Sequence, residues 1–153
     1  MQTILDQSRD KIRLLLVIND RIPSVNSIYQ FNRKTGVTYK TPLANKIYQE
    51  IQSQITLSGI CDFMPTFIKD RCWYKTTYQF VVRYGLETRD LSNMLKLVED
   101  AIHRKLGIDD HSVIELNCVK SLMNNNSRSE FIIFEIMPSE FDPMFFENKS
   151  NEV

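Results

Sequence analysis

The sequence predicts a single α+β domain in which a mixed β-sheet is packed by two main helices, and three observations support this fold class. A chain of 153 residues is long enough for one domain with a substantial core and too short for two. A composition of 42% hydrophobic and 25% charged residues is ordinary for a soluble globular protein. Finally, apolar residues recur with the periods of strands and helices in the order strand, helix, strand, helix, strand, strand.

The first half of the chain predicts a buried strand, a hairpin and a helix. Residues 11 to 19 contain an apolar run of strand length, too short for a signal-peptide core or a membrane span, so no membrane role is expected. Between residues 29 and 40, aromatic and basic side chains alternate around a glycine-containing turn, which predicts a hairpin-like loop. Thr41 and Pro42 supply an N-cap and a first-turn proline for a helix that ends before Gly59.

The second half predicts a half-buried strand, a long helix and two further strands. Residues 73 to 84 alternate in the manner of a strand with one buried and one wet face. Apolar residues at helical spacing predict a helix over residues 91 to 106, and strands at about 113 to 120 and 131 to 137 follow, separated by a turn at 124 to 127. The polar face of the long helix is expected to carry Ser92, Asn93, Lys96, Asp100 and His103.

The cysteines and the charges limit the function classes. Cys61, Cys72 and Cys118 are odd in number and far apart, which argues against a disulfide framework and a zinc site and favours a reducing, cytoplasmic location. The net charge is zero, but residues 1–10 carry −1 and residues 138–153 carry −3, which leaves +4 on the rest. That modest basic excess permits nucleic-acid binding without demanding it.

The same charge pattern divides the chain into three parts. Residues 1–10 are interpreted as an N-terminal extension, residues 11–137 as the domain, and residues 138–153 as an acidic C-terminal tail that contains phenylalanines. This tail fits a frayed terminus, a docking segment for a protein partner, or a competitor for the protein's own basic surface.

Residues 89–113, which contain the predicted long helix, are the most informative segment. Asp90 stands before the helix, and Asp109 and Asp110 follow Gly107 after it. Taken singly, Asp90 fits an N-cap, and the Asp109-Asp110 pair fits a turn. Taken together, carboxylates spaced at both ends of one helix suggest a metal site.

Nine residues of this segment form an ordered pattern, namely Arg89, Asp90, Asn93, Lys96, Asp100, Ala101, Gly107, Asp109 and Asp110. The pattern resembles the signature of the RusA family of Holliday-junction resolvases, which are crossover junction endodeoxyribonucleases. Residues 23–26 also resemble the family's Pro-Ser-x-Asn element, so that the resemblance covers roughly residues 12–137. The chain departs from the family at Ser92, where the second catalytic aspartate is expected.

The resemblance implies a RusA-like fold, a homodimer, and a structure-specific endonuclease that resolves four-way DNA junctions by metal-dependent phosphodiester hydrolysis. Mg²⁺ is the expected cofactor, with Mn²⁺ as a substitute, because hard cations prefer oxygen ligands. The implied catalytic residues are Asp90, Asp110 and Lys96, with Lys96 at the scissile phosphate or the leaving oxygen. The implied metal ligands are Asp90, Asp110, Asp109, Asp100 and, weakly, Ser92.

The implied partner is branched DNA, for which Arg33, Lys34, Lys40, Arg89 and Asn93 are the expected contacts. For each of these, a solvated surface position is the ordinary alternative. His103 and His111 are expected to be surface groups or to support the ligands, because an oxygen-rich site leaves histidine little role.

Two further hypotheses follow from the segment. A helix over residues 91–106 rises about 24 Å, so Asp90 and Asp110 should meet only across a two-fold axis, unless the helix is shorter or the chain reverses sharply. The alternative function is a catalytically weakened RusA-like protein that binds branched DNA or a protein partner. Ser92, the zero net charge and the phenylalanine-containing tail favour that alternative.

Overall fold

The computed structural model describes residues 5–7, 10–23, 29–69, 72–123, 127–141 and 143. Its strands are β1 (Leu5–Gln7), β2 (Ile12–Ile18), β3 (Tyr29–Asn32), β4 (Val37–Lys40), β5 (Tyr74–Val82), β6 (Val113–Leu122) and β7 (Glu130–Pro138). Its α-helices are α2 (Pro42–Ser58), α3 (Met64–Phe67) and α4 (Leu91–Leu106), and its 3₁₀ helices are η1 (Ile60–Asp62) and η2 (Asp110–Ser112). The predicted α+β class is confirmed.

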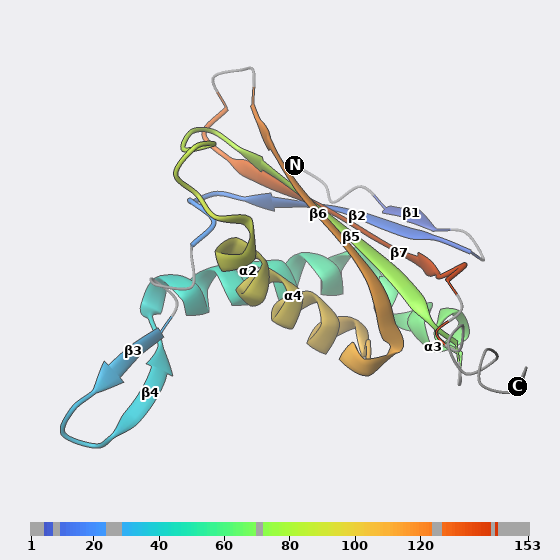
Figure 1. The fold of residues 1–153 in the computed structure, drawn as a ribbon, viewed down its shortest axis with the longest axis horizontal. Coiled ribbons are helices and arrows are strands. Elements are labelled where there is room, and N and C mark those ends of the chain that lie inside the picture. Colours follow the sequence, from blue (N-terminus) through green and yellow to red (C-terminus); the bar gives the residue numbers. More distant parts are fainter. Residues whose placement is uncertain are drawn as a thin grey trace, which may run out of the picture.

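The main sheet has the strand order β1-β2-β7-β5-β6, and the helices cover one of its faces (Figure 1). Strands β1, β2, β7 and β5 pair antiparallel, whereas β5 and β6 pair parallel. The parallel pair is joined by α4, which crosses over the sheet between them. The sheet is therefore mixed, as the sequence predicted.

The core lies between the sheet and the two long helices. Strand β5 alternates along its length, and Tyr78 and Phe80 on its inner face are fully buried. Ile47, Ile51 and Ile55 of α2 are fully buried in the same core, because a spacing of four keeps them on one face of the helix. Strand β1 extends the sheet at the far edge, so that part of the expected N-terminal extension pairs with the domain.

Both long helices begin and end at the residues that their caps predict. The Thr41 hydroxyl accepts a hydrogen bond from the Ala44 N–H at 3.3 Å and starts α2, which ends at Gly59. Asp90 caps α4, which ends at Gly107 with a φ of 70° that a residue with a Cβ rarely adopts. The predicted bounds of both helices are confirmed.

Strands β3 and β4 form a hairpin that projects away from the main sheet (Figure 1). Nearly every residue of it is exposed, so it contributes surface and no core. The Pro-Ser-x-Asn element beyond Pro23, the turn at residues 124–126 and tail residues 144–153 lie outside the described residues. Over the described ranges, no helix is long and apolar enough to cross a membrane.

Candidate functional site

The N-terminal end of α4 presents an exposed carboxylate. Asp90 accepts hydrogen bonds at 3.0 Å from the backbone N–H of Ser92 and at 2.8 Å from its hydroxyl. The Ser92 hydroxyl holds the pKa of Asp90 below its usual range, and the Ser92 N–H and the Lys120 charge lower it further. Asp90 is therefore an N-cap and also an ionised, outward-facing oxygen donor.

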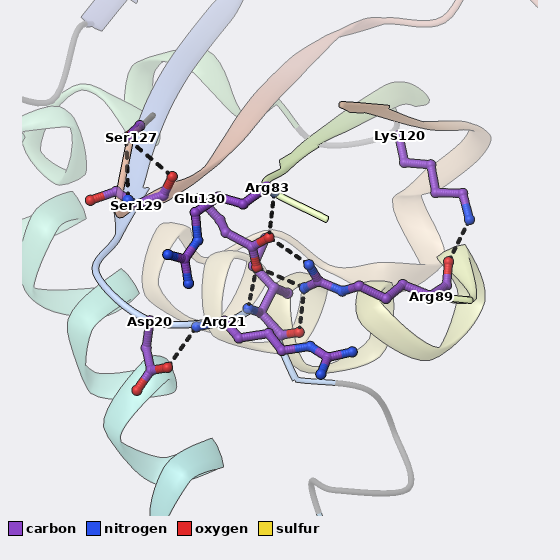
Figure 2. Close-up of polar contacts among 9 residues, drawn as sticks. Asp20, Arg21, Arg83, Arg89, Lys120, Ser127, Ser129 and Glu130 are labelled. Carbon is purple, nitrogen blue, oxygen red and sulfur yellow. Dashed lines mark hydrogen bonds and ion pairs between the residues drawn. The ribbon is translucent and has the colours of Figure 1, made fainter. Parts of the chain in front are cut away.

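Arg89, next to it, fixes this end of α4 from within. Its side chain is only 4% exposed and forms an ion pair with Glu130, and its Nη2 donates to the Ile22 carbonyl at 2.7 Å (Figure 2). The expectation that Arg89 contacts DNA is corrected, because its guanidinium is buried and is bound by Glu130 and the Ile22 carbonyl inside the protein. Arg89 anchors the start of α4, and Lys120 donates to its carbonyl at 2.6 Å.

The other end of α4 carries a chain of three polar groups. The Tyr78 hydroxyl lies 2.7 Å from Nε2 of His103, and Nδ1 of His103 lies 2.6 Å from Oδ1 of Asp110. Burial raises the pKa of Tyr78 well above its usual range, so its hydroxyl stays protonated and can donate to Nε2. Nδ1 then carries the hydrogen that is donated to Asp110, which orients a carboxylate whose side chain is 75% exposed.

The placement of His103 on the solvent side of α4 is corrected, because its side chain is buried between Tyr78 and Asp110. A histidine tolerates this position since both ring nitrogens have partners. Its expected role in supporting a ligand residue agrees with the contact to Asp110. His111 is exposed, as expected, and its Nδ1 lies 3.1 Å from Asp109.

Three of the expected metal ligands gather at this end. An open pocket of about 330 Å³ is lined by Asp100, His103, Arg104, Ile108, Asp109, Asp110 and His111. The backbone N–H of His111 donates to Asp109 and lowers its pKa, and the His111 side chain contributes to the same effect. Asp100 forms an ion pair at 3.6 Å with Lys40. Three carboxylates and one arginine line the pocket, so its lining is acidic on balance. Asp110 is held there by its hydrogen bond to the buried His103.

The basic residues expected at DNA lie along the hairpin and the polar face of α4. The Lys96 ammonium lies 5.9 Å from the centre of the Tyr29 ring, at the base of the hairpin. Lys40 lies over the Tyr48 ring at 3.8 Å, besides its ion pair with Asp100. Arg33 and Lys34 occupy the exposed turn, and Asn93 is half-buried. Lys40 is therefore already engaged, whereas the turn faces solvent.

The structure separates the two halves of the expected site. Asp90 and Ser92 lie at one end of α4, and Asp100, Asp109 and Asp110 lie toward the other. In the part of the chain that the structure describes, no group of three or more His, Cys, Asp or Glu residues is placed to hold a metal ion. A single chain therefore offers two incomplete sets of oxygen donors.

Two residues that support these ends were missed by sequence reasoning. Glu130 precedes an apolar run in the sequence. A charged residue at that position normally indicates only where a strand begins, so it did not predict a buried ion pair. Lys120 lies within β6 on the face toward α4, because it pairs with the buried Phe80. That direction depends on how β6 pairs with β5, which the sequence pattern does not give. No protein-family model matches the chain, and no curated protein matches it.

Proposed function

We propose that this protein is a RusA-like, homodimeric endonuclease that resolves four-way DNA junctions with the help of Mg²⁺. The observation that carries the proposal is the placement of two exposed carboxylates, each held by hydrogen bonds, at opposite ends of α4. Sixteen helical residues rise about 24 Å, so Asp90 and Asp110 of one chain are too far apart to share an ion. In a homodimer, a two-fold axis would bring Asp90 of one subunit to Asp110 of the other.

The donors fit a hard divalent cation only across such an axis. Asp90 and Ser92 would supply oxygens from one subunit, and Asp110 with Asp109 would supply them from its partner. A bound Mg²⁺ would supply charge neutralisation at the phosphate and a more acidic water. Asp90 is suited to this role because the Ser92 hydroxyl favours its ionised form. His103 would keep the Asp110 carboxylate in one orientation through its buried bond to Tyr78.

The surfaces around α4 suit a nucleic-acid backbone. Lys96 is exposed on the same helix as Asp90, in reach of a phosphate that approaches the start of α4. Arg33 and Lys34 project further out on the hairpin, where they can hold a DNA arm without reading its sequence. The ends of α4 would thus carry out the hydrolysis, and the hairpin would position the DNA.

Ser92 favours a second candidate, a catalytically weakened protein of the same family that binds branched DNA or a protein partner. Its hydroxyl contributes no charge, and it donates a hydrogen bond to the Asp90 oxygen that a metal would otherwise use. Cleavage tests separate the endonuclease from a weakened protein that binds branched DNA, since both predict junction binding. A weakened protein that binds only a protein partner would not bind the junction.

The first prediction concerns junction cleavage by the single variants. Asp90→Asn and Asp110→Asn should abolish Mg²⁺-dependent nicking of a synthetic four-way junction, because each removes one ligand charge, while gel-shift affinity is retained. Asp10→Asn, an exposed carboxylate near the β1 edge of the sheet, is the matched control and should nick normally. Nicking by either site variant at the parent rate contradicts the assignment. Binding without nicking by the parent in Mg²⁺ or Mn²⁺ favours the weakened protein.

Mixing the two inactive variants tests whether the site is shared. In a heterodimer of Asp90→Asn and Asp110→Asn subunits, one composite site carries both substitutions and the other carries neither, so nicking should return. An inactive mixture in which mass spectrometry detects heterodimers would show that each site lies within one subunit.

A further inference from the structure

Two arginines from distant parts of the chain contact the same exposed tyrosine ring. The guanidinium carbon of Arg21 lies 5.3 Å from the centre of the Tyr84 ring, and that of Arg83 lies 5.6 Å from it. The tyrosine is 49% exposed. An aromatic ring attracts a guanidinium that lies close to it, which restricts the positions that the guanidinium takes. These three residues therefore form an ordered basic group at the surface, which we call the arginine cluster.

The buried carboxylate of Glu130 brings the two arginine-bearing segments together. The backbone N–H of Ile22, the residue after Arg21, donates to its Oε1 at 2.8 Å, and the N–H of Arg83 donates to its Oε2 at 2.9 Å (Figure 2). Glu130 is fully buried and is also bound by Arg89, so both segments are fixed from inside the domain. The arginine cluster is therefore positioned by the folded core, unlike the charged side chains of the projecting hairpin.

The positive charge of the arginine cluster has no carboxylate partner in the described part of the chain. Neither Arg21 nor Arg83 forms an ion pair there. The neighbouring Asp20 pairs with Lys46 at 3.8 Å, and Glu130 is already neutralised in its buried ion pair. Nε of Arg83 is buried and has no hydrogen-bond partner among the described residues. A buried donor without a partner is unfavourable, so this atom indicates a place for an acceptor from outside the protein.

A tight turn connects the arginine cluster to the Asp90 end of α4. The carbonyl of Gly85, the residue after Tyr84, accepts hydrogen bonds from the N–H groups of Thr88 and Arg89 at 3.1 and 2.9 Å. Gly85 has a φ of 76°, and a Cβ at this position would lie 2.9 Å from Cδ of Arg89. The chain therefore passes from the cluster to Asp90 through one compact turn, which keeps the two close.

We propose that Arg21 and Arg83 form a binding site for the backbone phosphates of a DNA strand that approaches Asp90. This inference rests on the proposed function for the choice of DNA as the source of the phosphate. A guanidinium donates two parallel hydrogen bonds to a phosphate and stays charged at physiological pH. Tyr84 holds both guanidinium groups in place before the strand arrives. The cluster thus fixes the strand relative to Asp90, whereas the hairpin holds an arm further out.

The first test leaves the charge of the protein unchanged. Tyr84→Leu removes the ring that orders both guanidinium groups, so it should weaken binding of a synthetic four-way junction about two- to fivefold in fluorescence anisotropy. Tyr84→Phe keeps the ring and is the matched control, which should bind as the parent does. All three proteins carry the same charge, so general electrostatic attraction does not explain a difference between them. Equal affinities for Tyr84→Leu and Tyr84→Phe overturn the proposed site.

The second test removes the two charges. Arg21→Ala combined with Arg83→Ala should weaken junction binding at least about tenfold and make its dependence on the logarithm of the salt concentration shallower by about two. Lys11→Ala combined with Arg13→Ala removes the same charge at the other end of β2, beside Glu135, and should change the affinity much less. Equal losses in the two double variants overturn the site.

Lysine substitutions keep the second test decisive if the alanine variant is unstable. Arg21→Lys combined with Arg83→Lys retains both charges but not the paired hydrogen bonds of a guanidinium. This variant should keep the salt dependence of the parent and still bind the junction more weakly. An affinity equal to that of the parent would reduce the cluster to two unspecific charges and overturn the proposed site.

The source of the phosphate and the endonuclease are tested separately. If phosphorus NMR shows that the double alanine variant loses binding of inorganic phosphate but its junction affinity equals the parent's, the assignment to DNA is overturned. If the parent nicks junctions and this variant binds and nicks them equally well, the site is wrong and the endonuclease stands. If the parent binds without nicking in Mg²⁺ or Mn²⁺ and the variant loses binding, the site is supported and the endonuclease is not.

Discussion

The carboxylate of Glu130 receives hydrogen bonds from three separate parts of the chain. Besides the Arg89 guanidinium, the backbone N–H groups of Ile22 and Arg83 donate to it at 2.8 and 2.9 Å (Figure 2). Burial disfavours its ionised form, but the bonds from Arg89, Ile22 and Arg83 outweigh burial and lower the pKa of Glu130. The pair therefore links β7 to the ends of β2 and β5 and to the start of α4.

Glu130→Gln should destabilise the protein by about 3–5 kcal/mol, because it leaves the Arg89 charge buried without a partner. Glu135→Gln on the same strand is the matched control. Its carboxylate pairs with Lys11 and Arg13 at the surface and should contribute no more than about 1 kcal/mol. Urea unfolding followed by circular dichroism measures both, and a Glu130→Gln effect as small as the control's would contradict the anchoring role.

The Arg89–Glu130 ion pair determines the direction in which the stability of the protein changes with pH. The pKa of Glu130 is lower in the folded protein than its ordinary value of 4.5. Its contribution to folding stability is therefore complete above pH 4.5 and is lost as the pH falls through the pKa of the folded protein. The parent should therefore lose stability below about pH 4.5 more steeply than Glu130→Gln does.

Ser92→Asp should restore the charge that the RusA signature has at this position. If the remaining ligands are in place, the variant should bind Mg²⁺ more tightly and nick junctions faster, since each added carboxylate strengthens the attraction for the cation. Ser92→Asn, similar in size to aspartate but uncharged, is the control. Calorimetric titration with Mg²⁺ and nicking rates measure the effect. An unchanged metal requirement would mean that Asp100 or Asp109 already compensates.

Sequence reasoning located the carboxylates of the candidate site at the ends of α4 but not all of their surroundings. Asp90 and Asp110 were placed correctly at the two ends of α4, because the caps of a helix are local signals. Arg89 and His103 were placed in solvent, whereas both are buried. Their partners, Glu130 and Tyr78, are 41 and 25 residues away in the chain, and periodicity carries no information about such distant pairs.

At the scale of elements, the β3–β4 hairpin is the part of the molecule most easily altered without loss of structure. Its side chains are exposed, and its strands pair only with each other. Its base meets α4, where Tyr29 lies beneath the Lys96 ammonium. The hairpin is therefore a projection with exposed charges, next to the helix that carries the candidate site.

Replacing both Arg33 and Lys34 by alanine should weaken junction binding. The slope of the logarithm of the binding constant against the logarithm of the salt concentration should become shallower by up to about two. The thermal midpoint should change little, since both side chains are exposed. Arg13→Ala combined with Lys46→Ala removes the same charge from other exposed positions and serves as the control. Fluorescence anisotropy at several salt concentrations measures the slope, and equal losses in the two double variants would leave the hairpin without a special role.

The elements themselves were largely predictable, but their pairing was not. Alternation in β5 and spacing in α2 and α4 gave the element types and nearly all of the bounds. The parallel pairing of β5 with β6 and the addition of β1 at the far edge depend on contacts between distant segments. Local patterns do not encode those contacts, so a mixed sheet could be predicted without its strand order.

At the scale of the whole molecule, the charges are unevenly distributed along a chain whose net charge is zero. The residues from 138 onward carry −3. Pro138 is the last residue of β7, and Ser139 follows it. The Ser139 hydroxyl lies 2.5 Å from Glu115, and its N–H donates to the Trp73 carbonyl. Truncation after Ser139 therefore keeps these contacts and removes the entire acidic excess.

The protein that ends at Ser139 carries a net charge of +3, because the deleted residues contain Glu140, Asp142, Glu147 and Glu152 against Lys149. It should bind a four-way junction more tightly at low salt, with a difference that shrinks as salt screens the added attraction. A full-length variant with Glu140, Glu147 and Glu152 changed to glutamine also carries +3 and is the control that separates charge from length. If that variant binds like the truncated protein, the tail competes through its charge. If truncation alone changes binding, the phenylalanine-containing segment acts by contact, and a fall in thermal midpoint on truncation would make the tail part of the folded core.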